Sequence, residues 1–304
     1  MRLSEKIARG LGIDESYVKI IATRNHLYAK YYIPKKNGKR RLILQPSKEL
    51  KVVQRWLLKN ILCYFPVSKY SFAYSKGDSI NKNAAVHSRG EHLLHTDISD
   101  FFPSISRKML LYYFINNKQI VTELDLTRED IELILDICLY RGENLVVGSV
   151  ASPRIANMVM YEFDLQLKKI LDEYGRYQYT RYADDIVISS MSFIDEDILI
   201  KINQLMVEHG FQMNKDKTYY MGKNKKRQVT GIVLDNNQNI LTIGNKKYKE
   251  FQRKLYCYLV KKEGDLAYIK GYLSYIKGIN RKQYEQLVTI YRRYDQKKEL
   301  FADI

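Results

Sequence analysis

Two adjacent aspartates, Asp184 and Asp185, interrupt the otherwise apolar run YTRYADDIVIS at residues 179–189. The flanking residues have the β-branched and aromatic character of a buried strand. Because successive side chains of a strand point to opposite faces, both carboxylates can serve one site only near a tight turn. Two like charges this close also repel by roughly 4 kcal/mol at an effective dielectric near 20. The run therefore predicts a hairpin with residues 183–185 near its tip and a positive species bound there.

The overall charge of the chain indicates a polyanionic partner. Of the 304 residues, 45% are hydrophobic, which is enough to bury a large core. The chain has 51 Lys and Arg residues but only 34 Asp and Glu residues, so its net charge is +17. The basic residues recur along the whole length, and nucleic acid is the first partner to expect. A proteome rich in Lys and Tyr would give the same excess of basic residues without any nucleic-acid partner. The sequence motifs are therefore needed to decide between these two explanations.

The sequence gives no sign of a zinc site, a disulfide framework or a membrane span. Cys63, Cys138 and Cys257 lie far apart, without CxxC or Cys/His spacing. The N-terminal stretch MRLSEKIARG is charged where a signal peptide would be apolar, and no apolar stretch approaches the length of a bilayer span. We expect a soluble, cytoplasmic protein without membrane contact.

Hydrophobic periodicity and capping residues predict a mixture of helices and strands. The predicted helices cover residues 4–25 with a break near Gly12, 47–62, 106–140, 151–171 with Ser152 as cap, 195–209, and 245 onward with breaks at Gly264 and Gly278. The predicted strands cover 28–34, 39–46, 92–98, 178–189 and 227–243, the first two joined by a two-residue turn at Asn37-Gly38. This mixed order indicates the α+β class and not a doubly wound sheet.

The acidic pair has a candidate partner in Asp97, which ends the predicted strand at 92–98. Hard oxygen ligands without a nearby His or Cys suit Mg²⁺, which is commonly held by one or two carboxylates and substrate phosphates. Two such ions about 3.5 to 4 Å apart would clamp an in-line phosphoryl displacement. For a lone Asp-Asp pair, a solvated hairpin tip is the alternative.

Five short motifs, taken together, resemble those of one enzyme family. The strings DISDFF (97–102), VGSVASPRIAN (147–157) and YADD (182–185) resemble, in order and spacing, the palm motifs of reverse transcriptases. The strings NAAVH (83–87) and VTG (229–231) resemble the NAxxH and VTG elements of retron reverse transcriptases. Each string is weak alone, but the five occur in order, and the resemblance runs from about Tyr28 to Tyr294.

The resemblance implies a catalytic metal cluster and a deoxynucleotide pocket. Asp97, Asp184 and Asp185, with the backbone carbonyl of Ile98, would hold two Mg²⁺ ions. Phe102 would stack under the sugar of the incoming nucleotide and leave no room for a 2′-hydroxyl. Without the motif, Phe102 would be interpreted as a core residue.

Further nucleotide-binding residues follow from the same resemblance. Gly148 would allow close approach of the nucleotide or template, and Val147 and Asn157 lie in the same motif. The family often has Leu-Pro-Gln-Gly where this chain has LVVG (145–148), so Val146 and Val147 cannot supply the hydrogen bond of a Gln.

Three basic residues complete the predicted nucleotide site. Lys39 and Arg41 alternate onto one face of the first hairpin, where they would reach the triphosphate, although charges protecting an edge strand are the alternative. Lys217, in GFQMNKDKT (210–218), would lie near the leaving pyrophosphate and protonate it, with a plain surface lysine as the alternative.

The candidate RNA-binding and primer-binding residues lie in three parts of the chain. They are Asn83 and His87 of NAAVH, Tyr182, Thr230 and Gly231 of VTG, and Tyr248, Arg253 and Tyr272 of the basic, tyrosine-rich C-terminal segment. An isolated His is more often structural than catalytic, so we interpret NAAVH as a structural or RNA-facing element. VTGIVL is apolar enough to form a strand beside the catalytic hairpin and to shape the primer grip.

The predicted architecture is a right hand: fingers from 1–92 and 105–144, palm from 93–104 and 145–243, and an RNA-binding thumb from 244–304. The resemblance implies RNA-directed DNA synthesis from dNTPs on a cognate noncoding RNA that is both template and primer. The product would be branched RNA-linked DNA, and an antiphage role with an accessory effector protein would follow. The alternatives are another bacterial reverse transcriptase (diversity-generating, group II intron-like or abortive-infection type) or a non-catalytic RNA-binding scaffold.

Overall fold

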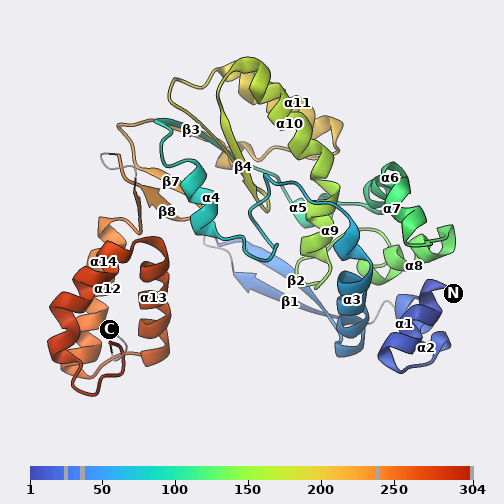
Figure 1. Cartoon of the computed structure of the whole chain (residues 1–304), viewed down its shortest axis with the longest axis horizontal. Helices are drawn as coiled ribbons and strands as arrows, with labels where there is room; N and C mark the ends of the chain where they lie inside the picture. The colour runs from blue at the N-terminus through green and yellow to red at the C-terminus, as the bar shows by residue number, and fades with distance from the viewer. Residues whose placement is uncertain (24–26, 35–37, 237–239, 302–304) are drawn as a thin grey trace.

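The computed structural model of the chain describes residues 1–23, 27–34, 38–236 and 240–301. Helices and strands alternate in the mixed order of an α+β protein, which confirms the predicted class. Three parts are visible in Figure 1: short helices with a long hairpin, a sheet covered by helices, and a C-terminal helical bundle. In these described ranges, no helix combines the length and the apolar character that a membrane span needs.

The N-terminal part packs short helices beside a β-hairpin. Gly12 ends the first helix with a φ of 66°, and the hydroxyl of Ser47 caps the third by accepting a hydrogen bond from Leu50 N at 3.2 Å. The helices are α1 (Leu3–Leu11), α2 (Glu15–Thr23), α3 (Lys48–Asn60), α6 (Arg107–Asn116), α7 (Lys118–Glu123) and α8 (Arg128–Cys138). The hairpin pairs β1 (Tyr28–Pro34) with β2 (Arg40–Pro46), as predicted. Of the predicted turn, Asn37 lies outside the described residues.

A four-stranded antiparallel sheet carries the acidic residues. Its strands are β3 (His92–Asp97), β4 (Gln178–Tyr182), β5 (Asp185–Ser190) and β6 (Tyr219–Met221), in the order β4-β5-β3-β6. The first three were predicted. The sequence analysis missed β6 because its three residues follow a polar, basic segment and show no alternation of apolar and polar side chains.

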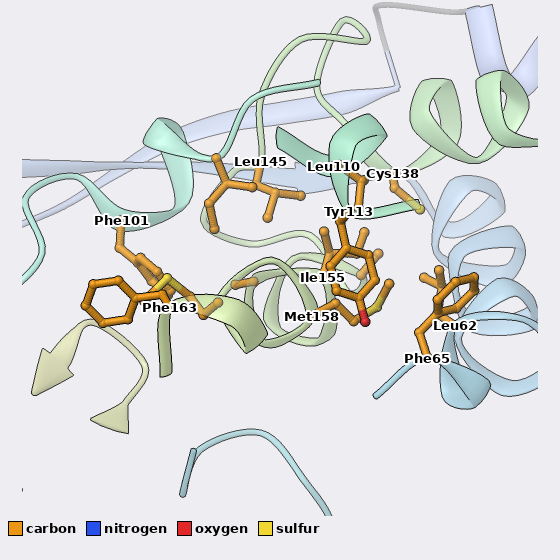
Figure 2. Packing of buried hydrophobic residues seen from close by; sticks show 14 of the residues in the cluster. Leu62, Phe65, Phe101, Leu110, Tyr113, Cys138, Leu145, Ile155, Met158 and Phe163 are labelled. Carbon is orange, nitrogen blue, oxygen red and sulfur yellow. The ribbon is translucent and has the colours of Figure 1, made fainter. Parts of the chain in front are cut away.

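Helices α9 (Ser152–Val159), α10 (Tyr161–Tyr174) and α11 (Glu196–Glu208) pack against this sheet. The prediction of one helix over 151–171 was wrong, because the chain breaks at Met160 and the apolar spacing is the same on both sides of the break. Ser152 is not the cap either: its hydroxyl accepts a hydrogen bond from Val146 N at 3.4 Å. Figure 2 shows the buried side chains of Ile155 and Met158 of α9 near Tyr113 of α6 and near Leu62 and Phe65 of the segment that follows α3.

A second, three-stranded sheet is formed by β7 (Arg227–Val229), β8 (Ile232–Leu234) and β9 (Leu241–Thr242), beside helix α4 (Ile80–Val86). VTGIVL was predicted to form a strand beside the catalytic hairpin, but it forms a turn between two short strands that belong to a sheet of their own. Val229 pairs with Ile232, and Thr230 and Gly231 form the turn between them with φ angles of 45° and 86°. Apolar residues on either side concealed this turn in the sequence.

The C-terminal bundle consists of α12 (Asn245–Tyr256), α13 (Leu266–Ile279) and α14 (Arg281–Tyr291), as the sequence predicted. The second break comes at Asn280 and not at Gly278, which lies in the last turn of α13. Asn280 begins the next helix by accepting a hydrogen bond from Gln283 N at 3.0 Å. The bundle has its own hydrophobic core.

Candidate active site

The hairpin of β4 and β5 brings the acidic residues to one edge of the main sheet. Tyr182 pairs with Asp185, so Ala183 and Asp184 form a two-residue turn, and Ala183 has a φ of 59°. Asp97, the last residue of β3, is the direct partner of Asp185 across the two strands. The backbone N–H of Ile98 donates a hydrogen bond to the carbonyl of Asp184 at 3.1 Å. Three carboxylates from two distant segments therefore meet at this edge.

The pKa values of Asp184 and Asp185 are shifted in opposite directions. Burial, together with the negative charges of Asp97 and Asp185, raises the pKa of Asp184 to about 6. Burial also opposes ionisation of Asp185, but the hydrogen bond and charge of His95, together with a hydrogen bond to Asp97 and the charge of Lys217, lower the pKa of Asp185 on balance. His95 Nε2 lies 3.5 Å from Asp185 Oδ1. Such mutual repulsion marks a place where a cation would be stabilised.

Two residues of the segment before β6 hold Asp97. Lys217 Nζ lies 2.7 Å from Asp97 Oδ2, and Asn214 Nδ2 donates to Asp97 Oδ1 at 3.1 Å. The backbone of Asn214 also donates to the Asp97 carbonyl at 2.8 Å. Burial opposes the charge of Lys217, but the hydrogen bond to Asp97 raises its pKa, so Lys217 stays protonated. The structure therefore places Lys217, a predicted catalytic residue, in contact with the acidic centre.

The donor chemistry of this edge fits Mg²⁺. The carboxylate oxygens are hard ligands, and Asp184 is destabilised in its charged form by its acidic neighbours. Lys217 forms an ion pair with Asp97, and His95 forms one with Asp185 when its ring is protonated. Across the described part of the chain, no three His, Cys, Asp or Glu side chains are grouped closely enough to hold a metal ion. The fit to Mg²⁺ therefore rests on the chemistry of the carboxylate oxygens and not on a preformed set of ligands.

Gly148 is required for a reason that differs from the prediction. Its φ is 112°, and a Cβ there would lie 2.8 Å from the carbonyl oxygen of Leu44 in β2. The carbonyl of the preceding Val147 accepts a hydrogen bond from Leu44 N at 2.9 Å. Gly148 thus permits close approach of the N-terminal hairpin to this loop. Its predicted contact with a nucleotide remains a prediction.

Asn157 is buried inside the protein. Its Nδ2 donates to the carbonyl of Ala73 at 2.8 Å, and its Oδ1 accepts hydrogen bonds from Ser71 Oγ at 2.9 Å and from Arg181 Nη1 at 3.1 Å. These contacts give Asn157 a structural role. Its predicted contact with a nucleotide remains a prediction that this placement does not favour.

Arg181 is a fully buried cation that contacts the turn carrying Asp184. Its Nε and Nη2 each lie 2.8 Å from a carboxylate oxygen of Asp164, and its Nη1 donates to the carbonyl of Ala183 at 3.0 Å. Tyr179 donates to the same carboxylate at 2.6 Å. The ion pair therefore holds the backbone turn that carries Asp184.

The remaining predicted nucleotide-binding residues, Lys39, Arg41 and Phe102, are exposed or half-buried. Arg41 belongs to β2, pairs with Ile33 and is exposed, and Lys39 precedes the same strand. Phe102 is half-buried in α5 (Phe101–Ser104), with its ring centroid 5.5 Å from that of Phe101. Phe101 itself is buried in the core, so the two neighbouring rings have different environments.

His87 of NAAVH is structural, in agreement with the first of the two predicted interpretations. It is fully buried, with Nδ1 2.7 Å from Ser189 Oγ and Nε2 2.7 Å from Thr180 Oγ1, and burial lowers its pKa to about 3. Asn83, also buried, donates to Thr230 Oγ1 at 3.5 Å. The NAAVH and VTG motifs therefore contact each other, which the sequence did not reveal.

Two clefts are lined in part by four of the remaining candidates for RNA or primer binding, which are Tyr182, Thr230, Gly231 and Tyr272. The larger, of about 660 Å³, lies between the acidic edge and the VTG turn, and its lining includes Tyr182, Asp185, Lys226, Thr230 and Gly231. A smaller cleft of about 420 Å³ in the C-terminal bundle is lined by residues of α12 and α13 that include Tyr272.

The bundle candidates differ in exposure. Tyr272 stacks on Phe251, with ring centroids 4.5 Å apart, and the Tyr248 hydroxyl donates to the carbonyl of Gln283 at 3.2 Å. Arg253 is exposed. Tyr248 is therefore partly structural, whereas Arg253 and the free edge of Tyr272 face the surroundings.

Sequence reasoning missed three residues of the site: His95, Asn214 and Arg181. His95 could have been found, because it lies on the same strand as Asp97 and two residues before it. Asn214 contacts Asp97 directly, but its segment shows no strand pattern that would place it there. The contacts of Arg181 depend on the packing of distant segments, and no local sequence pattern indicates them.

Comparison with known proteins agrees with this geometry. A family model described as reverse transcriptase (RNA-dependent DNA polymerase) matches residues 33–234. The chain is similar to the retron Ec86 reverse transcriptase of Escherichia coli, at 31% identity over 91% of this chain and 84% of the relative. It is also similar to the retron Ec73 reverse transcriptase of Escherichia coli, at 32% identity over 85% of both chains. The retron Mx65 reverse transcriptase of Myxococcus xanthus is 28% identical over 94% of this chain and 70% of the relative.

Among solved structures, the fold is similar to that of telomerase from Candida albicans in complex with a TWJ fragment of telomeric RNA. The TM-score is 0.52 at 13% identity, and the match covers 91% of this chain and 56% of that one. At this identity the likeness supports the right-hand polymerase fold alone.

Proposed function

This chain belongs to the retron reverse transcriptases and is an RNA-directed DNA polymerase, and from that premise we propose that it copies a cognate noncoding RNA into branched RNA-linked DNA. The observation that carries the proposal for the site is the pairing of Asp97 with Asp185 beside Asp184 at one sheet edge. We assign these three residues, with the Ile98 carbonyl, to the catalytic centre. The reaction joins a primer hydroxyl to the α-phosphate of a dNTP and releases pyrophosphate.

Two Mg²⁺ ions bound by these carboxylates would activate the attacking hydroxyl and stabilise the pyrophosphate. The protein's own residues do the remaining work. Lys217, protonated and beside Asp97, donates a proton to the leaving pyrophosphate. Arg181 holds the turn of Asp184 in place through the Ala183 carbonyl.

The nucleotide pocket in this proposal lies between the palm and the N-terminal hairpin. Lys39 and Arg41 reach over the triphosphate, and Phe102 packs under the sugar so that a 2′-hydroxyl is excluded. Gly148 keeps β2 close to the palm, as its contact with Leu44 indicates. The domain assignment proposed is fingers from 1–92 and 105–144, palm from 93–104 and 145–243, and thumb from 244–304.

The RNA is proposed to contact three surfaces. They are the cleft beside Asp185, the VTG turn, and the exposed basic and aromatic residues of the thumb. The net charge of +17 supports a polyanion spread over the protein surface. The proposed setting is the cytoplasm, in antiphage defence with an accessory effector protein.

The experiment that tests this function identifies the nucleic acid that copurifies with the protein. Treatment with RNase and then with debranching enzyme, followed by sequencing, should reveal DNA joined to RNA through a 2′-linked branch. Unbranched DNA would point to another class of bacterial reverse transcriptase. Bound RNA without any DNA, from cells supplied with the cognate RNA, would instead support a non-catalytic scaffold.

A further inference from the structure

Tyr74 combines three unusual properties beside the acidic centre. It has a φ of 69°, a backbone conformation that is uncommon for a bulky residue and is often found at functional sites. Its side chain is 50% exposed although the neighbouring Ala73 is buried. Its ring centroid lies 6.2 Å from that of Phe102, at an interplanar angle of 40°. An exposed aromatic ring in a constrained backbone conformation needs a physical explanation.

The segment before Tyr74 is fixed by the buried polar network of Arg181 and Asn157. The N–H of Phe72 donates to the Arg181 carbonyl at 2.8 Å, and the Ala73 carbonyl accepts from Asn157 Nδ2 at 2.8 Å. Ser71 donates to Asn157 Oδ1 at 2.9 Å. The same Arg181 holds the catalytic turn through Ala183. One buried network therefore sets the position of Tyr74 relative to Asp184.

Charged residues assigned to the proposed pocket influence Tyr74. Partial burial raises the pKa of Tyr74 to about 12, the negative charge of Asp184 adds to the rise, and Arg41 opposes it. The phenol thus remains a hydrogen-bond donor at neutral pH. Within the described part of the chain its hydroxyl makes no hydrogen bond, so the donor is available to a ligand that approaches the ring beside Phe102.

We propose that Tyr74 is a nucleotide-binding residue that extends the aromatic wall of Phe102 and donates a hydrogen bond to an oxygen of the incoming deoxynucleotide. The proposal rests on the proposed function, which assigns Phe102, Asp184 and Arg41 to that pocket. Contact between the two rings also supports Phe102 in the orientation that excludes a 2′-hydroxyl. Tyr74 is therefore a determinant of both nucleotide affinity and sugar selectivity.

Three variants separate the hydroxyl, the ring and the backbone. Tyr74→Phe removes only the hydroxyl. Tyr74→Asn removes the ring but keeps a residue type that tolerates positive φ. Tyr112→Asn is the matched control, because Tyr112 is 64% exposed on α6 and has no role in the proposed site. Each variant is tested as the full chain on a defined RNA template with a DNA primer.

The readouts are KM and kcat for each dNTP and the preference for dNTPs over rNTPs. Tyr74→Phe should raise KM about fivefold, because the loss of one neutral hydrogen bond weakens nucleotide binding by about that factor. The value of kcat should change little. Tyr74→Asn should raise KM about tenfold or more and lower the preference for dNTPs. Tyr112→Asn should match the wild type in all three quantities.

Wild-type KM and sugar preference in Tyr74→Asn would overturn the proposal. Should this variant fail to fold, as judged by thermal unfolding, Tyr74→Phe decides instead, and an unchanged KM there contradicts the hydrogen bond. A wild type that makes no DNA contradicts the proposed function. In that case, dNTP binding to the enzyme–RNA complex, measured in Ca²⁺ for wild type and Tyr74→Phe, still tests Tyr74.

Discussion

Asp97 and Asp185 are direct partners across strands β3 and β5, although they lie far apart in the sequence. Each has its own basic partner: Lys217 contacts Asp97 at 2.7 Å, and His95 lies 3.5 Å from Asp185. Asp184, at the neighbouring turn, has a raised pKa, because burial and the charges of Asp97 and Asp185 oppose its ionisation. This division of roles among three carboxylates leads to different expectations for each residue.

Asp184→Asn should stabilise the protein in metal-free buffer. The pKa of Asp184 rises from 3.8 to about 6 on folding, so ionisation of Asp184 opposes the folded state. This unfavourable contribution is absent below pH 4, grows as the pH rises to 6 and is constant above it. At pH 7 the variant should therefore gain about 1 to 3 kcal/mol in free energy of unfolding. Urea unfolding of both proteins at pH 4 and pH 7 in EDTA measures this; equal stability at both pH values would contradict it.

Lys217→Met should impair chemistry far more than folding. The Lys217 side chain is 53% exposed, so loss of its ion pair should change the free energy of unfolding by less than about 1 kcal/mol. Loss of a general acid should lower kcat by about a hundredfold or more. Single-turnover dNTP incorporation measures the effect, and Lys215→Met, an exposed residue of the same turn, is the control. A kcat equal to that of Lys215→Met would limit Lys217 to holding Asp97.

Arg181→Met should destabilise the protein severely. It leaves the carboxylate of Asp164 buried without its cation, which typically costs about 3 to 5 kcal/mol. Arg181→Met combined with Asp164→Leu removes both charges and should recover part of that loss. Urea unfolding of the two variants measures the difference. A double variant that is less stable than Arg181→Met alone would show that the ion pair is not the main contribution of Arg181.

Gly148→Ala should disturb the contact between the N-terminal hairpin and the palm. A Cβ at this position meets Leu44 O at 2.8 Å in addition to the cost of a φ of 112°. We expect a loss of about 2 to 4 kcal/mol in free energy of unfolding. Gly12→Ala is the control, because its φ is 66° but no atom lies within 4 Å, so strain alone should cost about 1 kcal/mol. Similar losses in the two variants would exclude the predicted clash.

Much of the fold could be predicted from local sequence signals. The alternation in β1 and β2, the cap at Ser47 and the acidic interruption at residues 184–185 all act over a few residues, and the structure confirms the elements that they predicted. The break at Met160 and the turn at Thr230 could not be predicted, because apolar residues continue on both sides of each. The α+β class and the order of most helices and strands were therefore accessible from sequence.

The geometry of the candidate site was accessible only in part. The meeting of Asp97 with Asp184 and Asp185 was predicted because a charged residue in an apolar strand is conspicuous. The burial of Asn157 against Arg181 was not predicted, because it depends on tertiary packing; the nucleotide contact that its motif suggested stays a prediction. Tyr74 gave no signal, since its position depends on hydrogen bonds between segments that are distant in sequence.

The central claim is that Asp97 and Asp185 belong to one catalytic centre, and a double-mutant cycle on primer extension tests it most directly. Asp97→Asn, Asp185→Asn and the double variant are compared with the wild type for single-nucleotide incorporation, with RNA affinity measured in parallel. Residues that act as a unit have non-additive effects, so each single variant should lose about a thousandfold or more in kcat and the double variant little beyond that. RNA affinity should stay at the wild-type value in all of them. Substantial synthesis by either single variant, with RNA binding intact, would contradict the account.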